Sequence, residues 1–198
     1  MKKIVLVLSF LFSTSFFAQE KVYYNFAVNN CGESSAEELI SKCLIGSYLL
    51  NYDFVTIQGK TVSTDKVKKP IVLIAASTRC APCWGDIPAL NKMVEKYNNK
   101  VEFIMFFWDD LDGIKRMQEK LDARIHLIPS TKKFDNKSYT ESYGFFHKLD
   151  YPTTYLISKD KKFLSIRRGA AYPSKDMNWD KVNEINEKEL EEFIKPVL

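Results

Sequence analysis

The sequence lacks several features that would assign a protein to a special class. The 198 residues contain no internal repeat and no low-complexity segment, and the seven glycines and seven prolines are scattered singly. Repeat architectures and flexible linkers are therefore excluded. With 45% apolar and 14% aromatic residues, the composition is that of a folded protein rather than a disordered one. The chain is long enough for a single domain with its own core.

A strong net charge is also absent. The formal charge is +4, and Lys2 and Lys3 supply two of these positive charges. This excess is too small to indicate nucleic-acid binding. Basic residues cluster locally at residues 66–69 and 159–162, where they are typical of solvated turns beside strands. We therefore expect no nucleic-acid partner.

The sequence has no apolar run long enough to span a membrane. Residues 4–12 are apolar except for Ser9, and residues 13–15 are polar, so the run ends short of the ~20 apolar residues of a spanning helix. Two lysines before this run and Ala18 after it give the layout of a secretory signal peptide. We expect cleavage after Ala18 and export to the periplasm. Retention of the uncleaved segment as an anchor is the alternative.

Cysteine is scarce, but its spacing is informative. Cys80 and Cys83 form a C-x-x-C pair, whereas eleven residues separate Cys31 from Cys43. A zinc site normally needs a second close pair or nearby histidines, so we expect no zinc. In an oxidising compartment disulfides persist, and the even number of cysteines makes a structural Cys31–Cys43 disulfide a hypothesis.

The order of elements around the C-x-x-C pair indicates the α/β class. Residues 71–76 form an apolar run typical of a fully buried strand, and apolar residues at helical spacing follow up to residue 97. A second strand followed by a second helix comes next, and this strand-helix-strand-helix order predicts parallel strands with right-handed crossovers. The other predicted elements are a helix within 34–50, a hairpin of 52–58 and 60–64, a strand at 101–108, a helix at 111–121, a helix-like segment at 139–147, a hairpin of 154–158 and 162–168, and a helix at 187–194.

The C-x-x-C pair lies between a buried strand and a helix, which favours thiol chemistry. Unpaired N–H groups and the dipole of a helix N-terminus stabilise a thiolate, which predicts Cys80 as the nucleophile. Cys83, about one turn later, is placed to resolve a mixed disulfide. Pro82 suits the first helical turn, and the charge of Arg79 should favour the thiolate. A disulfide in so small a ring is easily reduced, so we expect a redox-active centre.

Several short segments around and after the C-x-x-C pair match one family pattern. They are Lys69-Pro70, Cys80-Ala81-Pro82-Cys83, Ile87-Pro88, Tyr143-Gly144, Tyr151-Pro152-Thr153-Thr154 and Gly169. On these residues, from about residue 50 to the C-terminus, the sequence resembles the thioredoxin superfamily and, within it, the TlpA/ResA-like disulfide oxidoreductases exported by bacteria. The resemblance implies a three-layer fold with a mixed central sheet and helices on both faces. We accordingly expect a signal peptide (1–18), a mostly helical N-terminal extension (19–49) and a thioredoxin-like domain (50–198).

The resemblance also implies roles for single residues. Pro152 would be a cis-proline that faces the C-x-x-C pair and presents the backbone of Tyr151 to an extended client segment. Asp86 occupies a position where relatives often carry an acid, so it would accept or relay a proton for Cys83. The helix dipole alone also favours an aspartate near a helix start, which is the competing explanation.

Family resemblance further implies the partners. We expect client proteins with disulfides, a membrane thiol as electron donor, a monomer, and no metal or organic cofactor beside the Cys80–Cys83 disulfide. Three residues depart from the family pattern. Arg79 replaces the usual Trp before the first cysteine, Trp84 follows the second cysteine instead, and Ile74 replaces a buried acid of thioredoxin. Partner docking and general disulfide reduction are therefore expected to differ from an ordinary member.

The motif leaves alternatives open. It does not fix the direction of electron flow, so a disulfide oxidase or isomerase is an alternative to a reductase. A copper-binding module using Cys80, Cys83 and His147 is another, although related copper chaperones space their cysteines by three residues. A peroxidase is weaker still, because peroxide-reducing relatives have a Pro upstream of the position of Thr78, and residues 73–77 contain none.

Overall fold

The computed structural model describes residues 20–32, 35–131 and 140–198. The expected signal peptide lies outside the described residues. Within these three ranges no helix combines the length and the apolar character that crossing a membrane requires.

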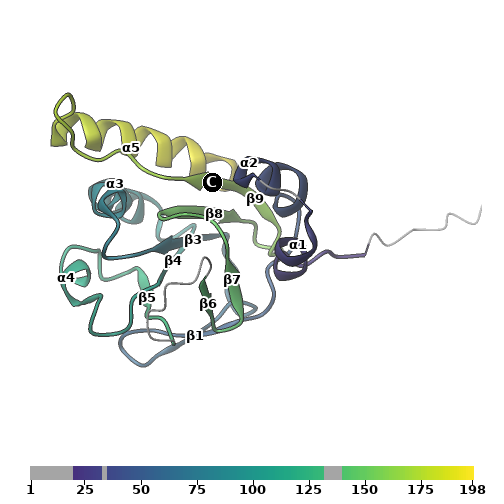
Figure 1. Ribbon diagram of the computed structural model, residues 1–198. Coiled ribbons are helices and arrows are strands. Elements are labelled where there is room, and N and C mark those ends of the chain that lie inside the picture. The colour runs from purple at the N-terminus through teal and green to yellow at the C-terminus, as the bar shows by residue number, and fades with distance from the viewer. Residues whose placement is uncertain (1–19, 33–34, 132–139) are drawn as a thin grey trace, which may run out of the picture.

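A five-stranded mixed sheet forms the middle layer, in the order β5-β4-β3-β8-β9 (Figure 1). β4 runs parallel to β3 and β5, whereas β8 is antiparallel to both β3 and β9. β3 is buried along its whole length because it is central and covered on both faces. The predicted mixed sheet is confirmed, and β5, too short to show a periodic pattern, is an addition. The strands are β3 (Ile71–Ala76), β4 (Glu102–Phe107), β5 (His126–Ile128), β8 (Thr153–Ile157) and β9 (Phe163–Arg168).

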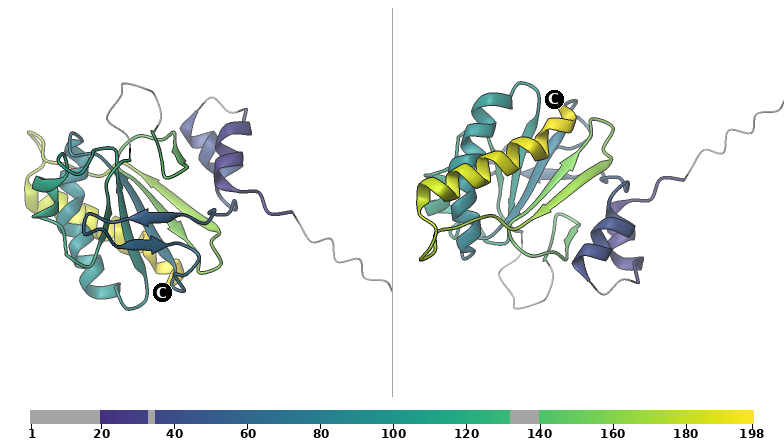
Figure 2. Two further views of the ribbon diagram at one scale, coloured as in Figure 1. Left: turned by 90° about the horizontal axis from the view of Figure 1, so that it is seen from below. Right: turned by 90° about the horizontal axis from the view of Figure 1, so that it is seen from above.

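Three helices cover one face of this sheet. α3 (Ala81–Tyr97) and α5 (Trp179–Ile194) pack against each other across it, and the short α4 (Lys115–Gln118) adds Met117 to the same core (Figure 2). Alternate residues of each strand face these helices, as strand geometry requires. The sheet residues in this core include Val72, Ile74, Phe103, Met105 and Phe107, and the helix residues include Ile87, Leu90, Met93, Leu190 and Ile194.

The opposite face has a different covering. Leu73, Ile104 and Phe106 point to this side and pack with Tyr24, Phe54 and Phe145. Helical cover on this face comes from the N-terminal helices, and two hairpins complete it. The elements are α1 (Tyr24–Asn30), α2 (Ala36–Glu38), the π-helix η1 (Leu39–Leu44), the antiparallel pair β1 (Asp53–Val55) and β2 (Thr61–Ser63), and the antiparallel pair β6 (Thr140–Ser142) and β7 (Phe145–His147). The 3₁₀ turn η2 (Lys195–Val197) ends the chain.

Two predicted helices are shorter than expected. The helix within 34–50 starts with the Ser35 side chain accepting the N–H of Glu38, but it ends at Leu44, just before Gly46 takes a positive φ of 89°. The helix at 111–121 shrinks to α4, because the Asp110 carboxylate accepts the N–H of Gly113 and holds a turn instead.

Two other boundaries also differ from the sequence prediction. The helix-like reading of 139–147 is wrong, because β6 and β7 form a hairpin there. Its two turn residues, Tyr143 and Gly144, have φ values of 55° and 80°, which suits a two-residue hairpin turn. The last helix starts eight residues before the predicted 187, at Trp179, because the Asn178 side chain caps it by accepting the N–H of Lys181.

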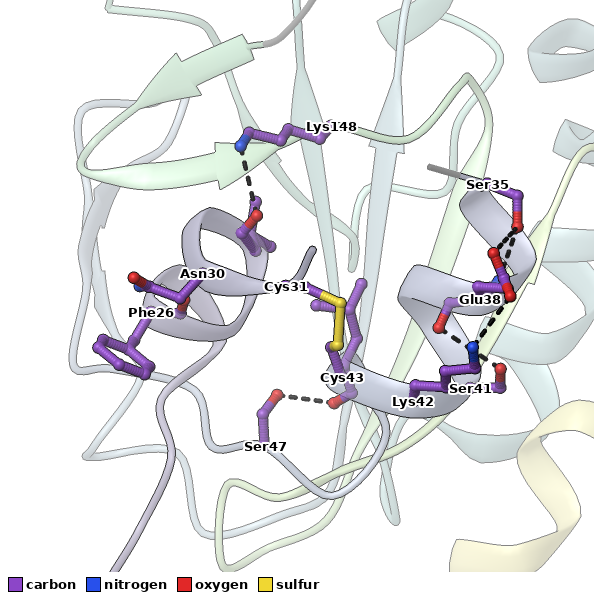
Figure 3. The surroundings of a disulfide bond; sticks show 12 residues. Phe26, Asn30, Cys31, Ser35, Glu38, Ser41, Lys42, Cys43, Ser47 and Lys148 are labelled. Atoms are coloured by element: carbon purple, nitrogen blue, oxygen red, sulfur yellow. Dashed lines mark hydrogen bonds and ion pairs between the residues drawn. A yellow bond between two sulfur atoms is a disulfide. The ribbon is translucent and has the colours of Figure 1, made fainter. Parts of the chain in front are cut away.

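A disulfide joins Cys31 and Cys43, with their Cα atoms 6.1 Å apart (Figure 3). Cys31 follows the last residue of α1, and Cys43 lies in η1. The bond therefore ties two short helices to each other. Closing a loop of this length stabilises the folded state by about 3 kcal/mol in the chain-entropy account.

A buried polar chain fastens α1 and β7 to the sheet. The Tyr24 and Tyr155 hydroxyls are 3.0 Å apart, and His147 Nδ1 lies 2.7 Å from the Tyr155 hydroxyl. All three side chains are buried. Each buried hydroxyl thus has a partner, which avoids the 1–3 kcal/mol or so that an unpaired polar group costs.

His147 should make the stability of the protein depend on pH. Burial lowers the pKa of His147 to about 4 from its ordinary 6.5. Between these values the unfolded chain binds a proton that the folded protein does not. The free energy of unfolding therefore falls as the pH falls through this window, by at most about 1.4 kcal/mol per pH unit.

We expect a His147→Gln variant to lose this part of the pH dependence. Urea unfolding at pH values between about 7 and 5 measures the slope in both proteins. The other histidine of the chain provides the control, since His126→Gln leaves His147 in place and should keep the part of the slope that His147 supplies. An unaltered slope in His147→Gln would contradict the assignment.

Candidate active site

The two thiols of the C-x-x-C pair lie at the start of α3. Cys80 is the N-cap, and its Sγ accepts the N–H of Cys83 at 3.2 Å. Cys80 is half-buried, whereas Cys83 is only 1% exposed, and both are free thiols. Only Cys80 is therefore open to attack a disulfide of another protein, and Cys83 stands one turn behind it.

The local environment pushes the two pKa values apart. A hydrogen bond from the Cys83 side chain lowers the pKa of Cys80, and the Cys83 N–H adds to this against the effect of burial. Burial raises the pKa of Cys83, and its contact with Cys80 raises it further. Cys80 is therefore the thiol that ionises first. From the sequence we expect the charge of Arg79 to favour the Cys80 thiolate. In the structure, the largest cause of the lowered pKa of Cys80 is the hydrogen bond from the Cys83 thiol.

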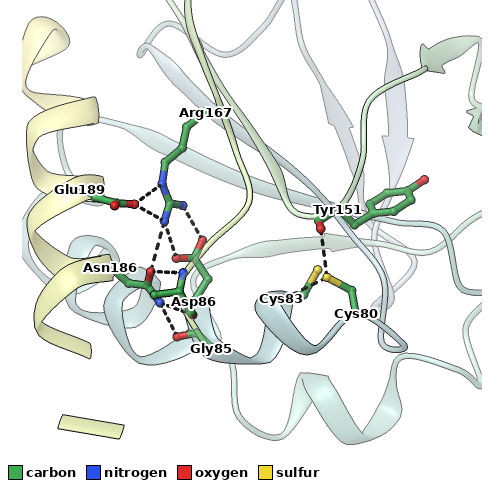
Figure 4. A network of polar contacts seen from close by, with 9 residues as sticks. Cys80, Cys83, Gly85, Asp86, Tyr151, Arg167, Asn186 and Glu189 are labelled. Atoms are coloured by element: carbon green, nitrogen blue, oxygen red, sulfur yellow. Dashed lines mark hydrogen bonds and ion pairs between the residues drawn. The ribbon is translucent and has the colours of Figure 1, made fainter. Parts of the chain in front are cut away.

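The loop before β8 meets the thiols from the opposite side. The Tyr151–Pro152 peptide bond is cis, and the Tyr151 carbonyl lies 3.2 Å from Cys80 Sγ (Figure 4). Pro152 is buried, and its own carbonyl accepts the N–H of Gly169 at 2.8 Å. This bond to the residue after β9 fixes the loop. The backbone next to Cys80 thus belongs to Tyr151 and Pro152, the two residues that the family resemblance placed there.

A carboxylate that the sequence analysis missed holds the loop before Cys80. Asp109 accepts hydrogen bonds from the Thr78 N–H at 2.8 Å and from the Thr78 hydroxyl at 2.7 Å. Asp109 follows β4, whose parallel neighbour β3 leads into Cys80. Because loops after adjacent parallel strands meet at one edge of a sheet, a polar residue directly after the second strand was a usable signal.

Trp84 reaches back over the same loop. Its indole N–H donates to the Thr78 carbonyl at 2.9 Å, and the Arg116 guanidinium lies 5.9 Å from the centre of its ring. The indole therefore braces the segment before Cys80, where relatives usually carry their Trp. Arg79 and Ala81 are exposed beside the thiol, and Pro82 occupies the second helical position, half-buried.

Asp86 lies in a buried polar network and not beside the sulfur atoms (Figure 4). Its two carboxylate oxygens accept hydrogen bonds from Arg167 Nη1 at 2.9 Å and Nη2 at 3.3 Å. Arg167 also contacts Glu189 and Asn186 of α5. Arg167 is not predictable as a site residue from the sequence. It belongs to the pair Arg167-Arg168 near a strand end, and such a pair looks exposed and gives no sign of a buried partner.

Asn186 locks the chain after β9 onto α3. Its side-chain amide donates to the carbonyls of Gly85 and Ala171, each at 2.9 Å, and accepts the N–H of Ala171 at 2.8 Å. A Cβ at position 85 would lie 2.3 Å from the Ala171 carbonyl oxygen, so only glycine allows this close approach. The helix that carries the thiols is therefore held by groups from α5 and from the loop before it.

His147 does not join the thiols in a metal site. Its ring packs on Tyr151 at 4.8 Å between ring centres, and its Nδ1 is bonded to Tyr155. In the described part of the chain, no three histidine, cysteine or acidic side chains are grouped so that they could hold a metal ion. The residues on which the copper alternative depends are thus not brought together.

The pKa of Cys80 offers a direct test of this geometry. In a Cys83→Ala variant the hydrogen bond from the Cys83 thiol is missing, so we expect the pKa of Cys80 to rise toward its ordinary 9.0. Thiolate absorbance in the ultraviolet, followed during a pH titration, measures it. An Arg79→Met variant is the comparison and should move the pKa less. The reverse order would show that Arg79 is the main stabiliser.

A family model and individual relatives both match this sequence. The model of the AhpC/TSA family matches residues 45–165. A thiol-disulfide oxidoreductase ResA of Bacillus cereus is 26% identical over 169 residues, which cover 84% of each chain. A ResA of Bacillus thuringiensis is 25% identical over 159 residues, covering 79% of this chain and 80% of the relative.

Solved structures show the same fold. A thiol:disulfide interchange protein DsbE from Chlorobium tepidum superposes with a TM-score of 0.53 at 18% identity, covering 77% of this chain and 96% of the other. A protein disulfide isomerase from Bacteroides thetaiotaomicron gives 0.52 at 15% identity, covering 74% and 88%. Since the family model spans more than half of the sequence, the chain belongs to the AhpC/TSA family, with the thioredoxin-like fold that the resemblance implied.

Proposed function

We propose that the protein is a thiol-disulfide oxidoreductase that exchanges the Cys80–Cys83 dithiol with disulfides of client proteins. One observation carries this proposal. A half-exposed Cys80 with a lowered pKa faces the Tyr151 carbonyl, and the buried Cys83 lies directly behind it. The ResA relatives, named as thiol-disulfide oxidoreductases, support the same activity. The two sulfur atoms carry both electrons, so the exchange needs no organic cofactor.

The reaction runs in two sulfur exchanges. The Cys80 thiolate attacks one sulfur of a client disulfide, and the other client sulfur leaves with the electron pair. Cys83 then attacks Cys80 Sγ in the mixed disulfide. This step forms the Cys80–Cys83 bond, breaks the bond to the client, and passes the proton of Cys83 to the departing client sulfur. The client disulfide is reduced to two thiols, and the protein dithiol is oxidised.

The cis-proline loop would guide the client during the first step. The Tyr151 backbone lies against Cys80 and leads directly into β8. An extended client segment placed along this backbone brings its disulfide within reach of the half-exposed thiol. Trp84 and exposed Arg79 lie at the same end of α3 and would contact that segment.

Reduction of clients is the proposed direction. The Cys80 thiolate is stabilised by a neighbouring thiol and one N–H, while the charge of Asp86 raises the pKa of Cys80. A reduced form that is only modestly stabilised gives up its electrons readily. We further propose export to the periplasm, where the Cys31–Cys43 disulfide persists, a membrane thiol as electron donor, and a monomeric state.

Mixed-disulfide trapping tests the mechanism. A Cys83→Ser variant can attack a client but cannot resolve the intermediate, so we expect covalent adducts with disulfide-containing proteins that dithiothreitol releases. Non-reducing electrophoresis followed by mass spectrometry measures them. The Cys80→Ser variant is the matched control and should give none. Absence of adducts in the Cys83→Ser protein would falsify the proposal.

The reduction potential tests the direction separately. Equilibration of the wild-type protein with glutathione or dithiothreitol buffers gives the fraction of the Cys80–Cys83 disulfide. We expect a potential on the reducing side, nearer the roughly −270 mV of thioredoxin than the roughly −120 mV of DsbA. A potential close to the latter would make the protein an oxidase while leaving the exchange mechanism intact.

A further inference from the structure

On the active-site helix α3, Asp86 forms a buried ion pair with Arg167. Both side chains are nearly buried, with 7% and 10% of their surface exposed. The Arg167 guanidinium donates one hydrogen bond to each carboxylate oxygen of Asp86. Arginine–carboxylate pairs with two such bonds are stronger than pairs with one. A buried ion pair of this kind is costly to break from one side, because the remaining charge has no partner.

The surroundings fix the direction in which Asp86 points. Arg167 comes from β9, and its guanidinium also donates hydrogen bonds to Glu189 at 3.1 Å and to the side-chain amide oxygen of Asn186 at 3.4 Å. Figure 4 shows the carboxylate of Asp86 directed at Arg167, further along α3 than the two sulfur atoms. Each oxygen of Asp86 thus already accepts a hydrogen bond from Arg167.

We propose that Arg167 is a positioning residue of the thiol exchange: it binds the Asp86 carboxylate, so that Asp86 acts as a fixed charge near Cys83 and not as a proton relay. The inference rests on the proposed function of the Cys80–Cys83 pair. It assigns to Arg167 a role in setting how readily Cys83 ionises when it resolves the mixed disulfide.

The charge of Asp86 shifts the pKa values of the two thiols in the same direction. The Asp86 charge raises the pKa of both Cys80 and Cys83. The pKa of Asp86 itself is raised, because burial outweighs the opposing charge and hydrogen bond of Arg167. Glu189 of α5 raises the pKa of Asp86 further. Loss of Arg167 therefore raises the pKa of Asp86 above its value in the intact pair.

The two roles predict opposite effects for Asp86→Asn. If Asp86 relays the proton of Cys83, its loss slows the resolving step. If Asp86 is a fixed charge, its loss lowers the pKa of Cys83, because the negative charge disappears while the Arg167 charge stays. Each unit by which a thiol pKa falls raises its thiolate fraction about tenfold below that pKa. We therefore expect faster resolution, by up to about tenfold at neutral pH.

The experiment measures the resolving step alone. Reduced protein is mixed in a stopped-flow instrument with 5,5′-dithiobis(2-nitrobenzoate). The Cys80 thiolate forms a mixed disulfide with one half of the reagent, and the other half leaves as the first coloured thiolate. Attack by Cys83 then forms the Cys80–Cys83 disulfide and releases the second coloured thiolate. The rate of this second release is recorded against pH for the wild type and for Asp86→Asn, Arg167→Met, Arg167→Lys and the double variant Asp86→Asn/Arg167→Met.

We expect three results. Asp86→Asn is faster than the wild type at neutral pH. Arg167→Met gains an additional inflection in its pH profile, from the titration of Asp86, and the double variant loses it. Arg167→Lys keeps a cation at the site and has no added inflection. Lys92→Met is the control. Lys92 is exposed on the same helix and pairs with Glu187, so its loss should leave the pH profile of the second release as in the wild type.

The failure modes are separable. A slower Asp86→Asn, or an Arg167→Met profile that superposes on the wild type, overturns the inference. A wild-type protein that never releases the second thiolate instead overturns the proposed function. Unfolding curves accompany each variant, and the double variant keeps the test valid if one single variant is unstable, because it leaves no unpaired buried charge.

Discussion

The antiparallel pairing of β8 with β3 is the constraint on which the site depends. In this register Thr153 lies opposite Ala75, so the residue after Pro152 is beside the end of the strand that leads to Cys80. Cys80 and Tyr151 are 71 residues apart in the chain, yet this strand pairing brings the Cys80 thiol and the Tyr151 carbonyl to 3.2 Å. A shift of one residue would turn the side chains of β8 to the wrong face of the sheet. The buried faces of both strands therefore fix the geometry of the reaction.

The same end of the sheet gathers the groups that tune the thiols. Parallel β4 delivers Asp109 to the loop before Cys80, and β9 delivers Arg167 to Asp86 on α3. α5 adds Asn186, which fastens α3 to the chain after β9 through the Gly85 and Ala171 carbonyls. Every one of these contacts reaches the active-site helix or its preceding loop from a different element. The thiols are thus placed by a rigid frame, which is what a short-range sulfur exchange requires.

The N-terminal segment reaches the opposite face of the sheet by other means. α1 and η1 are too short to be stable alone, and the Cys31–Cys43 disulfide and the buried Tyr24–Tyr155–His147 chain hold them there. His147 illustrates the limits of pattern reading, because as a residue type it suited a metal ligand. Burial against Tyr155 instead makes it part of the core.

Short-range patterns in the sequence were enough to predict the α/β class, the strand at 71–76, the helix that follows Cys80, the hairpin before the C-terminal helix, and the two thiols. These patterns are an apolar run, a helical spacing, and two cysteines one turn apart. The folded structure was needed to show that 140–147 is a hairpin, that Asp109 binds Thr78, and that Arg167 pairs with Asp86. An ion pair or a side-chain hydrogen bond between distant residues leaves no periodic pattern in the sequence. Such partners are chosen by strand order and by burial, which exist only once the sheet has formed.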